Sequence, residues 1–354
     1  PDARPFVLTR AGYAGVQRYS AVWTGDNVAS WDHFRLSIPM LLNMGVSGVP
    51  LIGSDVGGFS GNPSPELYAR WLQAAALTPF LRSHSEAGSN PHEPYSFGPD
   101  FTPINRASVE LRYRLLPYLY TLFQEHTETG APVMRPLWFE YPDDSRTYTI
   151  EDEYLVGRDL LVAPVVRESA TKRGVYFPAG DDWVDWWTGR TYQGGRDAEI
   201  DAPLDRLPLF ARAGAVIPVQ PVVQHTGEMS RVPLTLVAVY GAPRPYASLP
   251  PPGPLRASIV SRLYEDAGDG FDYTRGSSRT TTVTHTGTRL LLKRTGSYNV
   301  SRPLAAVEYI GLPFAPRTVK VGGRVVRDAA YDAAAHTLRI PLPAENVEEV
   351  EVEP

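Results

Sequence analysis

The first 136 residues alternate short apolar runs with amphipathic stretches, and this pattern predicts strands followed by helices. Residues 6–9 and 22–23 are predicted to be strands. The apolar spacing after Ser30 predicts a helix that Pro39 kinks and Gly45 ends. Such alternation is typical of an α/β protein with a parallel sheet.

The same alternation continues through two further units. Residues 46–52 are predicted to form a third strand and residues 79–81 a fourth. Between them, Ser64 followed by proline marks the start of a helix. A long helical pattern then begins near residue 105 and stops at Gly130. The strands end successively on Arg10, Asp26, Asp55 and His84.

After residue 137 the period changes to short strands separated by turn residues, which predicts an all-β region. Six prolines between Pro243 and Pro254 interrupt this region and indicate an extended insertion or linker. We therefore expect an α/β part followed by two β-sandwich domains. The predicted boundaries are 1–136, 137–222 and 223–354.

Composition narrows the possible functions of this chain of 354 residues. Its net charge of −5 offers no basic surface for nucleic acid, and no apolar run reaches the length of a membrane span. The lack of cysteine excludes disulfides and thiol nucleophiles, and no metal-ligand spacing or cofactor motif is present. No signal peptide is visible, which favours the cytoplasm, although a start at Pro1 suggests a piece of a longer protein.

Polar side chains end all four predicted strands. In a parallel barrel the strands point the same way, so Arg10, Asp26, Asp55 and His84 would ring one mouth, where barrel enzymes carry their active sites. Each residue also has a structural explanation: Asp26 as a helix cap, Arg10 in a surface ion pair, Asp55 in a turn and His84 in a loop. Four such ends in register favour a functional site.

The motifs around these strand ends resemble the catalytic barrel of glycoside hydrolase family 31 α-glucosidases. Order and spacing agree over many segments, among them Trp23-Thr24-Gly25-Asp26, Gly53-Ser54-Asp55-Val56-Gly57-Gly58-Phe59, Arg82-Ser83-His84, Leu207-Pro208-Leu209-Phe210 and Tyr264-Glu265-Asp266. The resemblance implies the C-terminal half of a (β/α)8 TIM barrel, followed by the family's two C-terminal β-domains. It also implies a retaining, exo-acting enzyme that removes terminal glucose from α-linked oligosaccharides.

The resemblance carries roles onto individual residues. It implies that Asp26 is the general acid/base, which protonates the glycosidic oxygen and later activates water. It implies that Arg10 and His84 hydrogen-bond the hydroxyl groups of the bound sugar. Trp23 and Phe59 would form the aromatic wall around that sugar.

Two further acids have weaker parallels. Asp55 matches an acid close to the substrate. The family takes its nucleophile from a Trp-x-Asp-Met-Asn strand end well before the acid/base, and this sequence contains no such motif. Trp183-Val184-Asp185 is superficially similar, but it follows Asp26 and lies in the β-rich part, where packing explains it better.

We therefore expect little or no turnover from the chain alone. The partner that we expect is the missing N-terminal half of the enzyme. An α-xylosidase or α-transglucosylase of the same family remains an alternative. So does a non-catalytic carbohydrate-binding protein with a vestigial half barrel.

Overall fold

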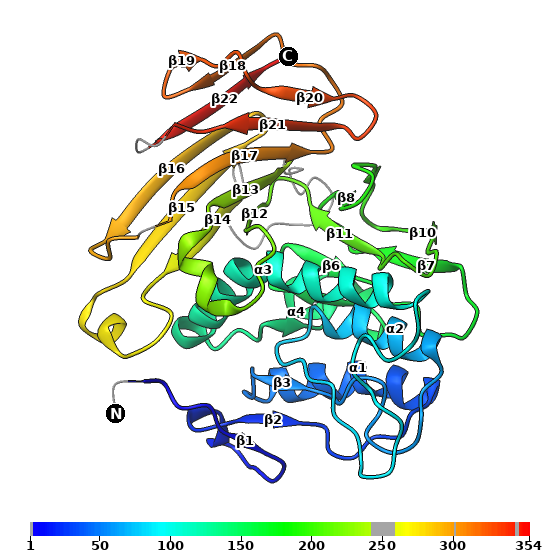
Figure 1. Cartoon of the computed structure of the whole chain (residues 1–354). Coiled ribbons are helices and arrows are strands. Elements are labelled where there is room, and N and C mark those ends of the chain that lie inside the picture. Colours follow the sequence, from blue (N-terminus) through cyan, green and yellow to red (C-terminus); the bar gives the residue numbers. More distant parts are fainter. Residues whose placement is uncertain (1–2, 242–258, 301, 344–346) are drawn as a thin grey trace.

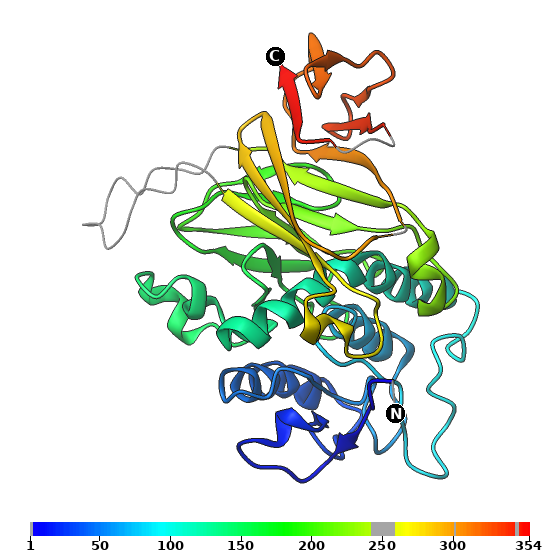
Figure 2. The ribbon, with the colours of Figure 1, turned by 90° about the vertical axis from the view of Figure 1, so that its left-hand side faces the viewer.

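The computed structural model describes residues 3–241, 259–300, 302–343 and 347–354. A small parallel sheet lies at one end, three long helices lie beside it, and stacked β-sheets extend to the other end (Figure 1). The view turned by 90° shows the same succession of layers (Figure 2). This order matches the predicted α/β part followed by an all-β part. The predicted proline-rich insertion at 243–254 lies outside the described residues.

The parallel sheet consists of β1 (Leu8–Thr9), β2 (Ala21–Trp23) and β3 (Ile52–Gly53), in that spatial order. The predicted fourth strand at 79–81 is wrong. The Phe80 amide donates to the Ile52 carbonyl at 3.1 Å, and the ladder continues only as a single parallel bridge between Asp55 and Arg82. Pro79 has no N–H to donate to a ladder, which shortens the pairing. The backbone of Phe80 nevertheless packs closely on Gly53, where a Cβ would lie 2.1 Å from its oxygen.

Three helices follow the strands, and local signals set their ends. They are α1 (Trp31–Val46), α2 (Pro65–Ala75) and α3 (Thr102–Thr129). The Ser30 hydroxyl accepts the His33 N–H and the Ser64 hydroxyl accepts the Leu67 N–H, each at 3.2 Å, as N-cap residues do. Helix α3 ends at Gly130, whose φ of 76° lies in the left-handed region.

The predicted end of α1 and the start of the third strand need correction. Helix α1 passes through Gly45 to Val46, and β3 begins only at Ile52. Gly45 therefore does not cap the helix. A Cβ on Gly45 would lie 3.3 Å from the Met134 carbonyl, so its small size serves a close contact with a neighbouring segment.

The first β-region has two sheets. The larger has the order β4-β5-β6-β11-β8-β9, with strands β4 (Met134–Arg135), β5 (Tyr154–Val156), β6 (Leu160–Val162), β11 (Leu209–Arg212), β8 (Trp183–Asp185) and β9 (Thr191–Tyr192). The smaller pairs β7 (Lys172–Phe177) with β10 (Arg196–Asp201). Buried Leu161 and Phe210 of the larger sheet share a core with Phe177 and Ile200 of the smaller.

The second β-region also has two sheets. One has the order β12-β13-β17-β21-β20, with strands β12 (Val216–Val219), β13 (Leu234–Val239), β17 (Leu304–Ile310), β21 (Thr337–Pro341) and β20 (Ala330–Asp332). The other has the order β14-β15-β16-β22-β18-β19, with strands β14 (Ile259–Glu265), β15 (Arg279–Thr286), β16 (Arg289–Gly296), β22 (Glu349–Glu353), β18 (Thr318–Val321) and β19 (Arg324–Val325). Buried residues of both sheets, such as Val307 and Val350, form one core.

Short helical segments connect these elements: η1 (Val16–Arg18), α4 (Leu137–Glu140), η2 (Ser145–Thr149), η3 (Thr226–Arg231) and η4 (Asp272–Arg275). The domain boundaries at 136 and 222 stay a prediction. No helix of the described residues is long and apolar enough to cross a lipid bilayer.

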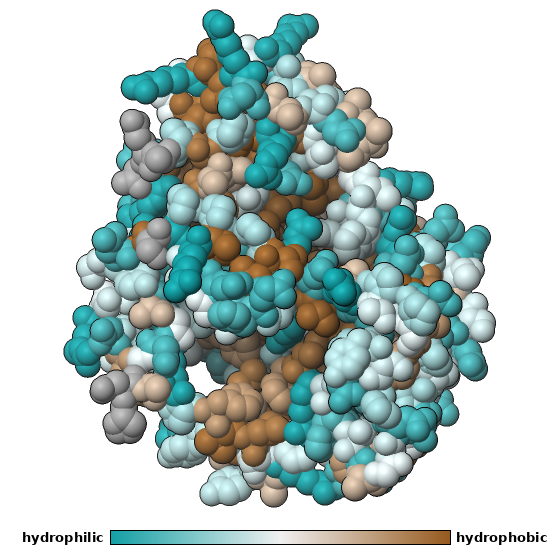
Figure 3. All heavy atoms as spheres, viewed as in Figure 1, coloured by the Kyte–Doolittle hydropathy of each residue, from teal (hydrophilic) through white to brown (hydrophobic). Residues whose placement is uncertain are grey.

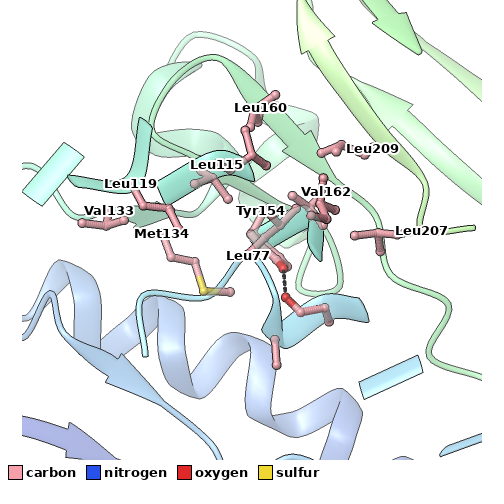
Figure 4. Packing of buried hydrophobic residues seen from close by; sticks show 14 of the residues in the cluster. Leu77, Leu115, Leu119, Val133, Met134, Tyr154, Leu160, Val162, Leu207 and Leu209 are labelled. Carbon is pink, nitrogen blue, oxygen red and sulfur yellow. Dashed lines mark hydrogen bonds between the residues drawn. The ribbon is translucent and has the colours of Figure 1, made fainter. Parts of the chain in front are cut away.

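One continuous core joins the parallel-sheet part to the first β-region. Leu115 and Leu119 of α3 pack among Tyr154, Leu160 and Val162 (Figure 4), all 3% exposed or less. The Tyr154 hydroxyl donates to the Ala74 carbonyl of α2 at 2.9 Å. Burial of this kind contributes roughly 1.5–3 kcal/mol per large apolar side chain. The helices of the barrel part are therefore held by the β-region.

The segment that leads into β1 is attached to the second β-region. The Arg4 guanidinium pairs with Asp266 at 2.8 Å and its Nε donates to the Gly270 carbonyl at 2.7 Å, while the Arg4 amide donates to Asp269. The Tyr120 hydroxyl of α3 donates to the same Asp266 at 2.7 Å. Asp266 thus binds a guanidinium and a hydroxyl, and Asp269 binds the main-chain amide of Arg4. Within the described ranges no group of three or more His, Cys, Asp or Glu is arranged to hold a metal ion.

Candidate active site

The ends of β1 and β2 bring the first two predicted site residues into contact. The Arg10 guanidinium lies 3.2 Å from the Asp26 carboxylate, and both side chains remain partly exposed, at 61% and 42%. Gly25 has a φ of 80°, and a Cβ there would lie 3.5 Å from the Arg10 side chain. The turn after β2 thus needs glycine. An accessible carboxylate beside a cation is available to a ligand.

Asp55, at the end of β3, has a different setting. Its side chain is 0% exposed and its Oδ1 accepts the Arg82 Nε–H at 2.5 Å, whereas its Oδ2 is buried without a partner among the described residues. Burial raises the pKa of Asp55, and the Asp26 charge adds to this effect; Arg82 and His84 act in the opposite direction. Both Asp26 and His84 are therefore within electrostatic reach of Asp55.

The predicted aromatic residues lie around these charges. Phe59 stacks on the His84 ring with centroids 5.4 Å apart and planes inclined by 30°. The Arg82 guanidinium lies 4.7 Å from the centre of the Trp23 ring, a cation–π arrangement. Arg82 thus contacts both Asp55 and Trp23, and links two of the predicted site residues.

Backbone hydrogen bonds hold the loops after β2 and β3 together. The Asn27 carbonyl accepts the amides of Phe59, at 2.7 Å, and Ser60, at 3.0 Å. Gly58 passes so close to the Ala29 backbone that a Cβ would lie 2.4 Å from its nitrogen. These contacts fix the position of the loop that carries Phe59 relative to the loop that carries Asp26.

The site residues come from the ends of β1, β2 and β3 and from the segment that carries Arg82 and His84. Arg10 contacts Asp26, Phe59 contacts His84, and Trp23 contacts Arg82. Sequence reasoning assigned no role to Asn27 or Arg82. Arg82 belongs to the motif Arg82-Ser83-His84, whereas the only indication for Asn27 in the sequence is its position directly after Asp26.

Asp185, the alternative acid in the β-rich part, is committed to local structure. It lies in β8, 5% exposed, and its Oδ1 accepts the amides of Trp187 and Thr188 at 2.8 and 2.9 Å. This geometry fits a turn-stabilising carboxylate and agrees with the packing interpretation.

The arrangement suits proton transfer to a sugar. An accessible carboxyl group stands beside a guanidinium, and an aromatic–histidine stack offers an apolar face and a polar edge for a ring that carries hydroxyl groups. A strand-end site of this composition on a β/α scaffold is typical of barrel glycoside hydrolases.

Comparison with known families gives the same class. The model for the glycosyl hydrolases family 31 TIM-barrel domain matches residues 1–122, and the model for the glycosyl hydrolase family 31 C-terminal domain matches residues 130–217. The chain belongs to glycoside hydrolase family 31, and carries the C-terminal part of its TIM barrel together with C-terminal β-domains. The family and fold class predicted from the sequence are confirmed.

Individual relatives show how much of the sequence and of the structure is shared. Alpha-glucosidase 2 of Bacillus thermoamyloliquefaciens is 47% identical over 273 residues, which are 77% of this chain and 33% of that protein. The structure of a Flavobacterium johnsoniae dextranase complexed with isomaltotriose is 32% identical, with a TM-score of 0.87, over 100% of this chain and 46% of that one. An α-xylosidase from Xanthomonas citri is 34% identical, with a TM-score of 0.77, over 87% and 34%. The chain thus spans about a third of the length of the α-glucosidase that it matches.

Proposed function

We propose that this chain is the C-terminal part of a retaining, exo-acting α-glucosidase in which Asp26 is the general acid/base. The contact between Arg10 and an accessible Asp26 at neighbouring strand ends carries the proposal. In this mechanism Asp26 protonates the leaving glycosidic oxygen, and then deprotonates the water that attacks the glycosyl intermediate. Arg10 and His84 hydrogen-bond the sugar hydroxyls, and Phe59 and Trp23 line the sugar.

The second carboxylate of a retaining enzyme lies about 5–5.5 Å from the first and forms the covalent intermediate. Asp55 is a poor candidate for it, because its side chain is fully buried and paired with Arg82. The nucleophile therefore has to come from outside this sequence, and we expect negligible turnover by the chain alone.

We propose the N-terminal half of such a barrel as the partner. Strand β1 is an edge of the parallel sheet, and Phe6 and Val7 beside it are 66% and 48% exposed. Apolar surface gathers over the region of β1–β3 (Figure 3). An open edge with exposed apolar residues favours pairing with further strands. The cytoplasm stays a prediction from the sequence.

The test is complementation with the preceding barrel segment of the Bacillus α-glucosidase, assayed on maltose. We expect the chain alone to be inactive, the complemented wild type to be active, and Asp26→Asn to lose on the order of 10²–10⁴-fold, the usual contribution of general acid–base catalysis. α-Glucosyl fluoride needs no protonation of its leaving group, so kcat/KM of Asp26→Asn, which reports formation of the glycosyl intermediate, should fall much less on that substrate. Asp32→Asn, whose side chain is 91% exposed, is the matched control. Wild-type rates on maltose for Asp26→Asn would refute the assignment.

A xyloside substrate is the alternative that an observation favours, because the Xanthomonas α-xylosidase shares the fold over 87% of this chain. Comparing kcat/KM on aryl α-glucoside and aryl α-xyloside in the complemented protein decides between them. Transfer of glucose to an added sugar would indicate an α-transglucosylase. Sugar binding without turnover would indicate a non-catalytic carbohydrate-binding protein.

A further inference from the structure

Glu86 connects the loop of His84 to the loop of Phe59. Its Oε1 accepts two hydrogen bonds, from the Ser60 hydroxyl at 2.8 Å and from the Gly61 amide at 3.1 Å. Its own amide donates to the Phe59 carbonyl at 2.9 Å. One residue thus makes three hydrogen bonds to three consecutive residues of the neighbouring loop.

These contacts complete the anchoring of Phe59. Its amide is held by the Asn27 carbonyl at 2.7 Å, and its carbonyl is held by Glu86. Phe59 is therefore fixed on both sides of its Cα, and its ring stacks on His84 at 5.4 Å. Since His84 lies only two residues before Glu86, the same residue restrains both partners of the stack.

The charge of Glu86 strengthens this connection. Hydrogen bonds from Ser60 and Gly61 lower the pKa of Glu86, so the side chain is ionised at neutral pH. Hydrogen bonds to an ionised acceptor are shorter and stronger than those to a neutral one. Two of them converge on one oxygen, which sets the distance between the loops.

We propose that Glu86 is a positioning residue for the sugar-facing pair Phe59 and His84. It acts by holding the loop backbones at the separation at which the rings stack. The benefit to substrate binding rests on the proposed function, whereas the positioning itself does not. Preorganisation of this kind lowers the cost of ordering a binding site when the ligand arrives.

The test measures the stack directly in this chain by NMR with ¹³C-labelled histidine and phenylalanine, with His84→Gln used for assignment. In the wild type we expect nuclear Overhauser contacts between the Phe59 and His84 rings, and a His84 Hε1 resonance displaced by the Phe59 ring current. Glu86→Ala removes the two side-chain hydrogen bonds but keeps the amide bond to the Phe59 carbonyl, so both signals should weaken strongly. Glu86→Gln keeps an acceptor oxygen and should restore them, and Ser60→Ala, which removes one donor, should weaken them.

The matched control is Glu93→Ala. Glu93 accepts a hydrogen bond from Ser96 within the same long loop at 3.1 Å, and it should leave the stack unchanged. Intact ring contacts in Glu86→Ala, or equal loss in Glu93→Ala, would overturn the proposal. If Glu86→Ala does not fold, unchanged signals in Ser60→Ala overturn it instead. Since no sugar is turned over, failure of the glycosidase assignment would leave this result standing.

Discussion

Glu153 gives this protein a pH-dependent stability that can be calculated from its setting. The side chain is 3% exposed, its Oε1 accepts the Tyr176 amide at 3.0 Å, and its Oε2 has no partner among the described residues. The Arg173 guanidinium lies 3.6 Å away, but the same nitrogen lies closer to Asp152, at 2.8 Å. Burial therefore outweighs the shared cation and raises the pKa of Glu153 to about 8.

The direction in which stability changes with pH follows from the pKa values of Glu153 in the folded and unfolded states. Glu153 titrates near 4.5 when unfolded and near 8 when folded, so the native state binds a proton that the unfolded state releases. The stability due to this proton is fully present below pH 4.5 and is lost as the pH rises to 8. Within that window each pH unit costs about 1.4 kcal/mol of unfolding free energy. Between pH 6 and pH 9 the loss at this single group is roughly 2.7 kcal/mol.

The perturbation is Glu153→Gln, which keeps an acceptor for the Tyr176 amide and removes the titration. We would measure urea unfolding by circular dichroism at pH 6, 7, 8 and 9. The variant should gain roughly 2.7 kcal/mol relative to the wild type between pH 6 and pH 9. Glu151→Gln, two positions away and exposed, should show no such gain. A difference between variant and wild type that stays constant with pH would refute the reasoning, because it would mean that Arg173 keeps Glu153 ionised.

Two further predictions concern the candidate site. Arg82→Ala leaves the buried Asp55 carboxylate without its cation, so we expect a loss of about 3–5 kcal/mol of unfolding free energy in urea titrations. A loss below about 1 kcal/mol, which is the value of an exposed ion pair, would contradict this expectation. Gly58→Ala should lower the thermal midpoint well below that of Gly88→Ala. Both glycines have φ near 93°, but only at Gly58 would a Cβ meet backbone, 2.4 Å from the Ala29 nitrogen. Equal thermal midpoints of the two variants would show that the loops after β2 and β3 can separate at no cost.

Sequence reasoning succeeded where the signal was local. Ser30 and Ser64 each accept an amide three residues ahead, a pattern contained within one helical turn, and both helix starts are confirmed. Asp26 could be singled out because an apolar strand and a glycine precede it directly.

It failed where distant segments decide the outcome. Gly45 fits a helix cap locally, yet its small size serves a contact with Met134, and the helix continues past it. The importance of Arg82 depends on Asp55, 27 positions earlier, which no local pattern reveals. Glu86 depends in the same way on Ser60 and Gly61.

The attachment of Arg4 to the second β-region also has a consequence for biosynthesis. Arg4 and Asp266 are separated by 262 positions. A ribosome that adds about 5–20 residues per second needs roughly 13–52 s to synthesise that interval. During this time the segment leading into β1 has emerged without the carboxylates that later hold it. The segment that leads into β1 is therefore secured by a region that is synthesised much later, and the nascent chain has to keep this segment from other partners until the loop that carries Asp266 has emerged.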